Sequence, residues 1–278
     1  MLFRSLATEN LKKIHSNTDY GYEFRLSKLE HYKGNLDSAK NAMLNAASLA
    51  GNNPVLLAAA LSNAGDLDLH AGKLEDAYKL YQKSIAKNSS DLHSIMGIGW
   101  ITLVHDKNDS LAKKIFLFVS TKTKLPEPIL KLSQAAELNN DSVSWKKYAQ
   151  QFVDITSDSI YGTMYNKYLI ELYTSILNNP EKAEAVAKNE IDNRVTPQTY
   201  AWYVWCLYFN NKKDEAYKVY EANVSGKPLE GIELYWMGKF MKGLGKGYNA
   251  SEFFKAAEKN KYDLSPSVMN DLDKNLKE

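Results

Sequence analysis

The sequence contains one cysteine, Cys206, which excludes an internal disulfide and a zinc site built from several cysteines. No apolar run reaches the length of a membrane-spanning helix, and none near the N-terminus is long enough for a signal-peptide core. The net charge is only +2, without long blocks of one sign. We therefore expect no membrane insertion and no nucleic-acid partner, and the sequence assigns no cellular compartment.

Motifs for catalysis and for metal or cofactor binding are also missing. The five histidines have none of the spacings that bind zinc, and no Gly-x-Ser-x-Gly nucleophile motif occurs. The run 243–247 looks like part of a phosphate-binding loop, but Phe240 stands where that motif begins with glycine. Gly247 stands where a serine or threonine would bind magnesium. We expect no metal, no cofactor and no enzymatic activity.

What the sequence does contain is a repeat of small residues. Gly65 and Gly99 are 34 residues apart, and Ala183, Ala216 and Ala250 follow at intervals of 33 and 34. An interval of this length is typical of arrays of helix pairs. Apolar residues also recur with a period near 3.6, which predicts helices rather than strands.

Turn signals divide the chain into about seven helix pairs. Trp145 stands where other pairs have alanine, so the fourth pair should be splayed by the larger side chain. A short final helix begins at Ser265–Pro266, with Val268, Leu272 and Leu276 on one stripe. The helix pairs are expected over residues 21–46, 54–85, 129–156, 160–187, 197–224 and 230–260, and the third pair carries Gly99, a turn at 106–109 and Phe116.

The small residues and aromatics follow a recognisable order. In the second pair, Gly65 is followed by a turn at Gly72–Lys73, then by Ala77 and Tyr81. With this pattern, the chain resembles a tetratricopeptide-repeat protein over about residues 20–262. The segments 205–208 and 264–266 are further similar to the C-terminal repeats of bacterial tetratricopeptide proteins that have no assigned ligand. The resemblance implies an all-α, right-handed superhelical solenoid with a concave groove lined by the first helix of each pair.

We expect one solenoid over residues 1–278, with repeats over 20–262 and a capping helix over 264–278. Residues 1–18 carry an apolar stripe and are expected to form a helix, half of a truncated repeat. If exposed, that stripe would favour a homodimer through the N-terminal helix.

The concave groove is the candidate functional surface. Tyrosine and tryptophan are common at positions that face a groove in this fold, and such residues contribute strongly to binding interfaces. The interpretation is a non-catalytic scaffold that binds a protein or peptide in an aromatic-lined groove. The predicted groove residues are Phe24, Lys28, Met96, Trp100, Leu103, Tyr165, Tyr168, Trp205, Tyr208, Phe209, Tyr235 and Lys239.

Two other functions remain open at this stage. The first is a carbohydrate or small-ligand module in which Trp100, Trp205 and nearby tyrosines stack on the ligand. The second is an RNA-binding helical repeat, which needs basic first helices to contact phosphates, and the near-neutral charge argues against it. Ser62 and Asp66 stand where the carboxylate-clamp tetratricopeptide domains have lysine and asparagine, so we do not predict a C-terminal carboxylate as the ligand.

Overall fold

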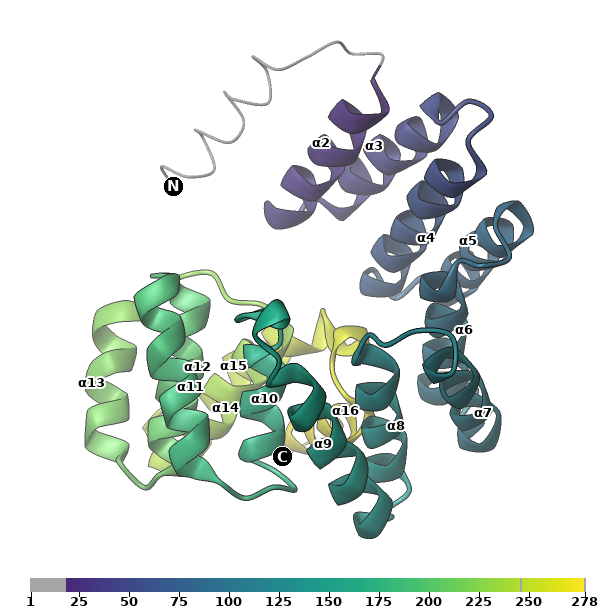
Figure 1. Cartoon of the computed structure of the whole chain (residues 1–278). Helices are drawn as coiled ribbons and strands as arrows, with labels where there is room; N and C mark the ends of the chain where they lie inside the picture. Colours follow the sequence, from purple (N-terminus) through teal and green to yellow (C-terminus); the bar gives the residue numbers. More distant parts are fainter. Residues whose placement is uncertain (1–18, 246, 278) are drawn as a thin grey trace. The chain divides into compact units, whose positions relative to one another are not determined.

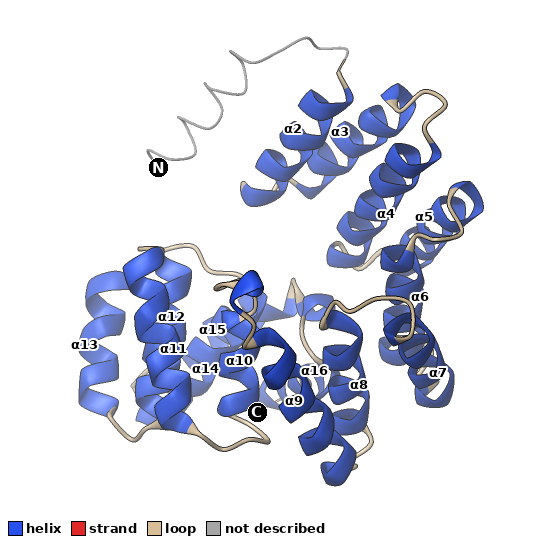
Figure 2. Ribbon diagram, in the orientation of Figure 1, coloured by secondary structure: helices blue, strands red, loops and turns tan. Residues whose placement is uncertain are grey.

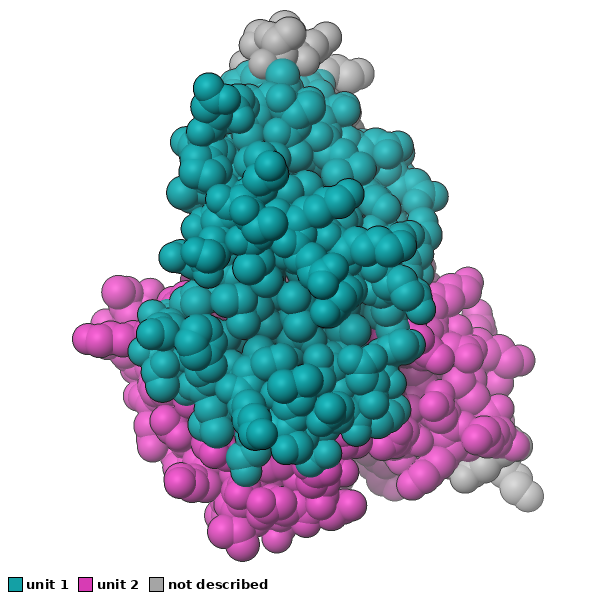
Figure 3. All heavy atoms as spheres, turned by 90° about the vertical axis from the view of Figure 1, so that its right-hand side faces the viewer, with its two compact units in different colours: residues 1–123 teal, residues 124–278 magenta. Residues whose placement is uncertain are grey.

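The computed structural model describes residues 19–245 and 247–277, and every regular element in these ranges is helical (Figures 1 and 2). The chain divides into two compact units, residues 1–123 and 124–278, which Figure 3 colours separately. The N-terminal helix expected over residues 1–18, and the homodimer through it, lie outside the described residues. The expectation of one continuous solenoid remains a prediction.

Unit 1 consists of three helix pairs. Each helix packs against its neighbours in the chain, and the first helices α4 and α6 also contact each other. The six helices are α2 (Tyr20–Tyr32), α3 (Leu36–Leu49), α4 (Pro54–His70), α5 (Leu74–Lys87), α6 (Leu92–Val104) and α7 (Asp109–Ser120).

Close contact between a glycine and an aromatic ring holds the pairs of unit 1 together. Tyr81 of α5 is fully buried, and a Cβ added at Gly65 of α4 would lie 2.7 Å from its ring. A Cβ added at Gly97 of α6 would lie 2.5 Å from the same ring. Any side chain at either glycine would overlap the ring, so both positions need glycine for three helices to meet at this point.

Unit 2 consists of four pairs and a C-terminal helix, together with the short 3₁₀ turns η1 (Ser159–Tyr161) and η2 (Lys261–Asp263). Its helices are α8 (Glu127–Leu138), α9 (Ser142–Thr156), α10 (Asn166–Tyr173), α11 (Pro180–Asn193), α12 (Pro197–Phe209), α13 (Lys213–Asn223), α14 (Gly231–Leu244), α15 (Ala250–Glu258) and α16 (Pro266–Asn275).

Two local features of unit 2 differ from the sequence-based expectation. A helix was expected from about Ile160, but that residue lies in η1, and Gly162 follows with a φ of +51°. A left-handed residue interrupts a helix, so α10 begins only at Asn166. In α9, Trp145 is half-buried, and Ala149 is the fully buried small residue one turn later. The predicted splaying of this pair therefore has no basis in the structure.

The C-terminal helix α16 contacts two helices that are far apart in the sequence. It packs on α15, which precedes it, and on α8, the first helix of unit 2. Leu272 is fully buried by this packing, and Met269 is nearly so. The expected cap would cover only the end of the array, whereas α16 links the end of unit 2 to its beginning. Within the described residues, the predicted all-α fold of seven helix pairs and a final helix is confirmed.

The contact between Gly238 and Phe254 provides a test of the packing rule. A Cβ at Gly238 would lie 2.6 Å from the Phe254 ring, which is buried, so we expect Gly238→Ala to destabilise unit 2 by about 1–3 kcal/mol despite the better helix propensity of alanine. Urea denaturation measures this change. In the control Gly231→Ala, the nearest side-chain atom is 3.5 Å away, and no loss of stability is expected. Equal stability of both variants would contradict the rule.

A second prediction concerns the link made by α16. Leu272→Ala removes a fully buried side chain and should destabilise unit 2 by about 2–5 kcal/mol. Hydrogen exchange should show faster exchange in α8 as well as in α15, because α16 packs on both. The matched control is Asp273→Ala, an exposed position on the same helix. Loss of protection limited to α16 would show that the link contributes little.

Candidate functional site

In unit 1, the first helices of the three pairs, α2, α4 and α6, are joined by polar contacts along one face. Lys28 of α2 donates from Nζ to Asn63 Oδ1 of α4 at 2.6 Å, and its ammonium lies 5.4 Å from the centre of the Phe24 ring. Asp66 of α4 in turn contacts Nε2 of His93 on α6 at 2.8 Å. We call Phe24, Lys28, Asn63, Asp66, His93 and Met96 the unit 1 face.

Asp66 is the electrostatic centre of this face. Its Oδ1 accepts a hydrogen bond from the buried Tyr81 hydroxyl at 2.8 Å, and both carboxylate oxygens contact His93. The hydrogen bond to Asp66 raises the pKa of His93 because it favours the charged imidazolium, which outweighs the opposite effect of burial. The His93 side chain is nevertheless 57% exposed, so a partner can reach it.

The predicted groove residues of unit 1 fall into two groups. Phe24, Lys28 and Met96 are exposed or half-buried and belong to the unit 1 face. Trp100 is only 5% exposed and Leu103 is fully buried, so both side chains serve packing and do not lie on the surface. The sequence pattern indicated the right helix but did not separate its core positions from its surface positions.

In unit 2, α14, which is the first helix of the last pair, contacts the C-terminal helix α16. Tyr235 donates from its hydroxyl to Asp271 Oδ2 at 2.7 Å, and Lys239 Nζ lies 2.9 Å from the same oxygen. Burial alone would raise the pKa of Asp271, but these hydrogen bonds and the Lys239 charge lower it. Tyr235 and Lys239, expected to contact a partner, therefore contact α16 of their own chain.

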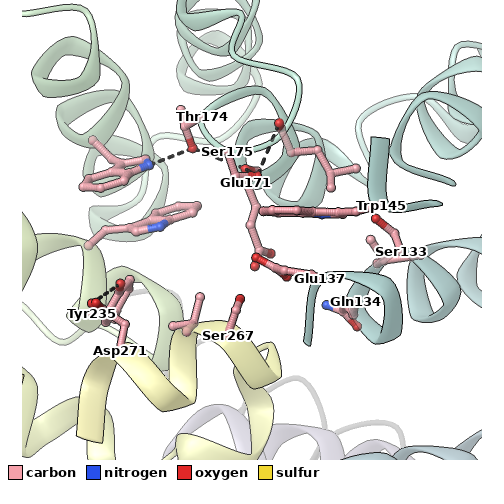
Figure 4. A pocket seen from close by; sticks show the side chains of 15 residues that line it. Ser133, Gln134, Glu137, Trp145, Glu171, Thr174, Ser175, Tyr235, Ser267 and Asp271 are labelled. Carbon is pink, nitrogen blue, oxygen red and sulfur yellow. Dashed lines mark hydrogen bonds between the residues drawn. The ribbon is translucent and has the colours of Figure 1, made fainter. Parts of the chain in front are cut away.

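A cavity of about 290 Å³ lies in unit 2 and is lined by α8, α9, α10, α12, α14 and α16 (Figure 4). Its walls combine carboxylates, hydroxyls and three indole rings. The lining residues are Leu130, Ser133, Gln134, Glu137, Trp145, Glu171, Leu172, Thr174, Ser175, Trp205, Tyr235, Trp236, Ser267, Val268 and Asp271.

Two carboxylates, those of Glu137 and Glu171, point toward one another in this cavity (Figure 4). Burial raises the pKa of Glu137 to about 7, the charge of Glu171 adds to the shift, and a hydrogen bond with Ser267 opposes it. Burial also raises the pKa of Glu171, against a hydrogen bond with Ser265 and the charges of nearby lysines. The pair is therefore poorly compensated when both carboxylates are ionised.

The indole rings form a further part of the cavity wall. Trp205 and Trp236 stack in parallel, with their centres 5.7 Å apart and an angle of 2° between the rings. Trp205 also donates from Nε1 to Thr174 Oγ1 at 3.0 Å. The Ser133 side chain is fully buried in the cavity wall, and its hydroxyl has no hydrogen-bond partner in the protein.

The remaining predicted groove residues mostly serve packing. Tyr165 is buried and donates to Glu127 Oε1 at 2.5 Å, while Tyr168 is half-buried. A Cβ added at Gly243 would lie 1.9 Å from the Tyr208 hydroxyl, so this tyrosine fills the contact between α12 and α14. The Phe209 ring lies beside Trp205, with 5.9 Å between ring centres.

Sequence reasoning missed the carboxylates of the cavity, although a signal was present. Glu137, Glu171 and Trp205 follow one another at intervals of 34 residues, the same interval as the glycine and alanine marks. They therefore occupy equivalent positions on α8, α10 and α12, and all three line the cavity. Asp271 could not be found in this way because α16 lies outside the repeats.

Within residues 19–245 and 247–277, no group of three or more histidine, cysteine or acidic side chains is arranged to hold a metal ion. None of the helices there combines the length and the apolar character needed to cross a membrane.

No protein-family model matches the chain, and no curated protein matches it. Among solved structures, a tetratricopeptide repeat protein from Parabacteroides merdae is similar over 93% of this chain and 99% of that one, with 16% identity and a TM-score of 0.50. The C-terminal part of a repeat-containing protein from Cytophaga hutchinsonii covers 78% of this chain and 92% of its own, with 15% identity and a TM-score of 0.29. A monomeric mutant of IFIT1 covers 98% and 73%, with 18% identity and a TM-score of 0.33.

The Parabacteroides structure supports the fold through the similarity of almost the whole of both chains. Together with the neighbour-to-neighbour packing of the helix pairs, it establishes the architecture that the glycine and alanine marks predicted. The chain has the tetratricopeptide-repeat fold, an array of helix pairs, and is similar in this fold to the Parabacteroides protein.

Proposed function

We propose that the protein is a non-catalytic scaffold that binds a protein or peptide segment on the unit 1 face. The observation that carries this proposal is the ladder of contacts from Lys28 to Asn63 and from Asp66 to His93, which joins α2, α4 and α6 into one surface. The side chains held in this way are prevented from rotating freely, so less entropy is lost when a partner binds them.

The composition of the face suits a peptide. Phe24 and Met96 provide apolar area, while Lys28, Asp66 and His93 provide charges of both signs. A mixture of apolar contacts and a polar rim is typical of protein interfaces that form and dissociate. Extended or helical segments bind grooves of helical proteins through such alternating anchors.

The first-helix face of unit 2 is less available than that of unit 1. Tyr235, Lys239 and Lys242 of α14 are engaged with Asp271 and Asn275 of α16. The ring of Trp205, which the carbohydrate hypothesis used for stacking, lies against Trp236. A partner that binds this face of α14 would have to displace α16, whereas a partner of the unit 1 face uses side chains that are already accessible.

The proposal can be tested by photo-crosslinking in the native cell. A crosslinking residue at Met96 should capture one protein partner, whereas the same residue at Lys83, exposed on α5, should not. For the identified partner, Lys28→Glu should weaken binding by roughly tenfold or more, because it reverses a charge on the face. The matched charge reversal Lys83→Glu should leave the affinity within about twofold. Equal loss in both variants would place the binding surface elsewhere.

A further inference from the structure

We propose that the cavity of unit 2 is a binding site for a primary alkylammonium group. The group would be held by the carboxylates of Glu137 and Glu171, with indole rings beside it (Figure 4). This site is separate from the unit 1 face and does not depend on the function proposed for that face.

The charge of the cavity wall selects a cation. The lining residues include three carboxylates, those of Glu137, Glu171 and Asp271, and neither lysine nor arginine. Asp271 is already paired with Lys239, which leaves Glu137 and Glu171 facing one another. A positive charge between them would relieve the repulsion that the ionised pair otherwise carries.

The hydrogen-bonding groups favour an ammonium that carries N–H donors. Ionised carboxylates only accept hydrogen bonds, and a primary ammonium has three donors. The indole rings that line the same cavity are independent of the acidic pair and are the second observation that indicates a cationic ligand.

The aromatic rings and the volume favour an organic cation over a metal ion. Trp145, Trp205 and Trp236 line the cavity, and indole faces attract ammonium groups within about 6 Å. A cavity of ~150 Å³ accepts benzene. The volume here, about 290 Å³, therefore suits an alkyl chain of several carbons with its ammonium group.

Two sources would supply this chemistry, a free aliphatic diamine or the lysine side chain of a peptide. The probes are 1,5-diaminopentane and the peptide acetyl-Gly-Lys-Gly-amide, and the neutral controls are 1,5-pentanediol and glucose. Calorimetry with the full chain at pH 8 should detect at least one amine with a Kd below about 1 mM, and neither neutral compound. Tighter binding of the peptide would identify a lysine side chain as the source, and tighter binding of the diamine would identify a free amine.

The variant Glu171→Gln should weaken binding of the amine by at least about tenfold, because one charged hydrogen-bond acceptor is lost. Since burial disfavours the ionised form of this side chain, the amide should fold at least as well as the parent, and helicity checks this. The control Glu215→Gln, exposed in the first turn of α13, should bind like the parent. Unchanged binding in Glu171→Gln, no binding of either amine, or preference for glucose would overturn the proposal.

The affinity should also depend on pH. Glu137 has a pKa of about 7 in the free protein, and a bound cation favours its ionised form. The amine itself stays protonated in this range, so affinity should rise about tenfold from pH 6 to pH 8, with release of a proton. Glu137→Gln should remove most of this dependence, and a flat profile in the parent would contradict the role of Glu137. The charged and titratable groups around the two carboxylates are Lys131, Lys167, Glu233, Tyr235, Lys239 and Asp271.

Discussion

Close contact between a residue without a side chain and an aromatic ring is the interaction on which this protein depends. Tyr81 against Gly65 and Gly97, Phe116 against Gly99, and Phe254 against Gly238 each bring helices to a distance that no larger residue permits. A helix pair cannot bury its apolar face alone, so these contacts also fix how one pair meets the next. The positions of the first helices, and therefore of the surfaces they present, follow from these few contacts.

The two units are built from the same kind of helix pair but present different surfaces. In unit 1, the polar ladder from Lys28 to His93 remains accessible. In unit 2, Asp271 of α16 binds Tyr235 and Lys239 at the corresponding face of α14, and the cavity is partly walled by α16. One repeat architecture thus provides an accessible face in one unit and a cavity lined by several helices in the other.

The sequence was sufficient to predict the helix pairs because glycine, alanine and aromatic residues recur at the interval of the fold. It was less informative about which side chains are exposed. Trp100, Leu103 and Tyr208 lie on the expected helices, but each is a packing residue, because a shift of one position on a helix changes its direction by about 100°. The cavity could not be predicted without knowing where α16 packs. Its contact with α8 joins residues more than a hundred positions apart, and the repeat pattern of the sequence does not indicate it.

The link between α16 and α8 also affects how unit 2 folds. In an open array of repeats, each pair contacts only its neighbours, so end repeats can unfold while the rest remains folded. A contact between the first and last helices converts the linear chain of interactions into a closed one, and neither end can open without loss of that contact. Contacts of such long sequence separation form late and slow the folding reaction. We therefore expect unit 2 to unfold in a single cooperative step and to refold more slowly than unit 1, whose described helices pack on helices that are close in the sequence.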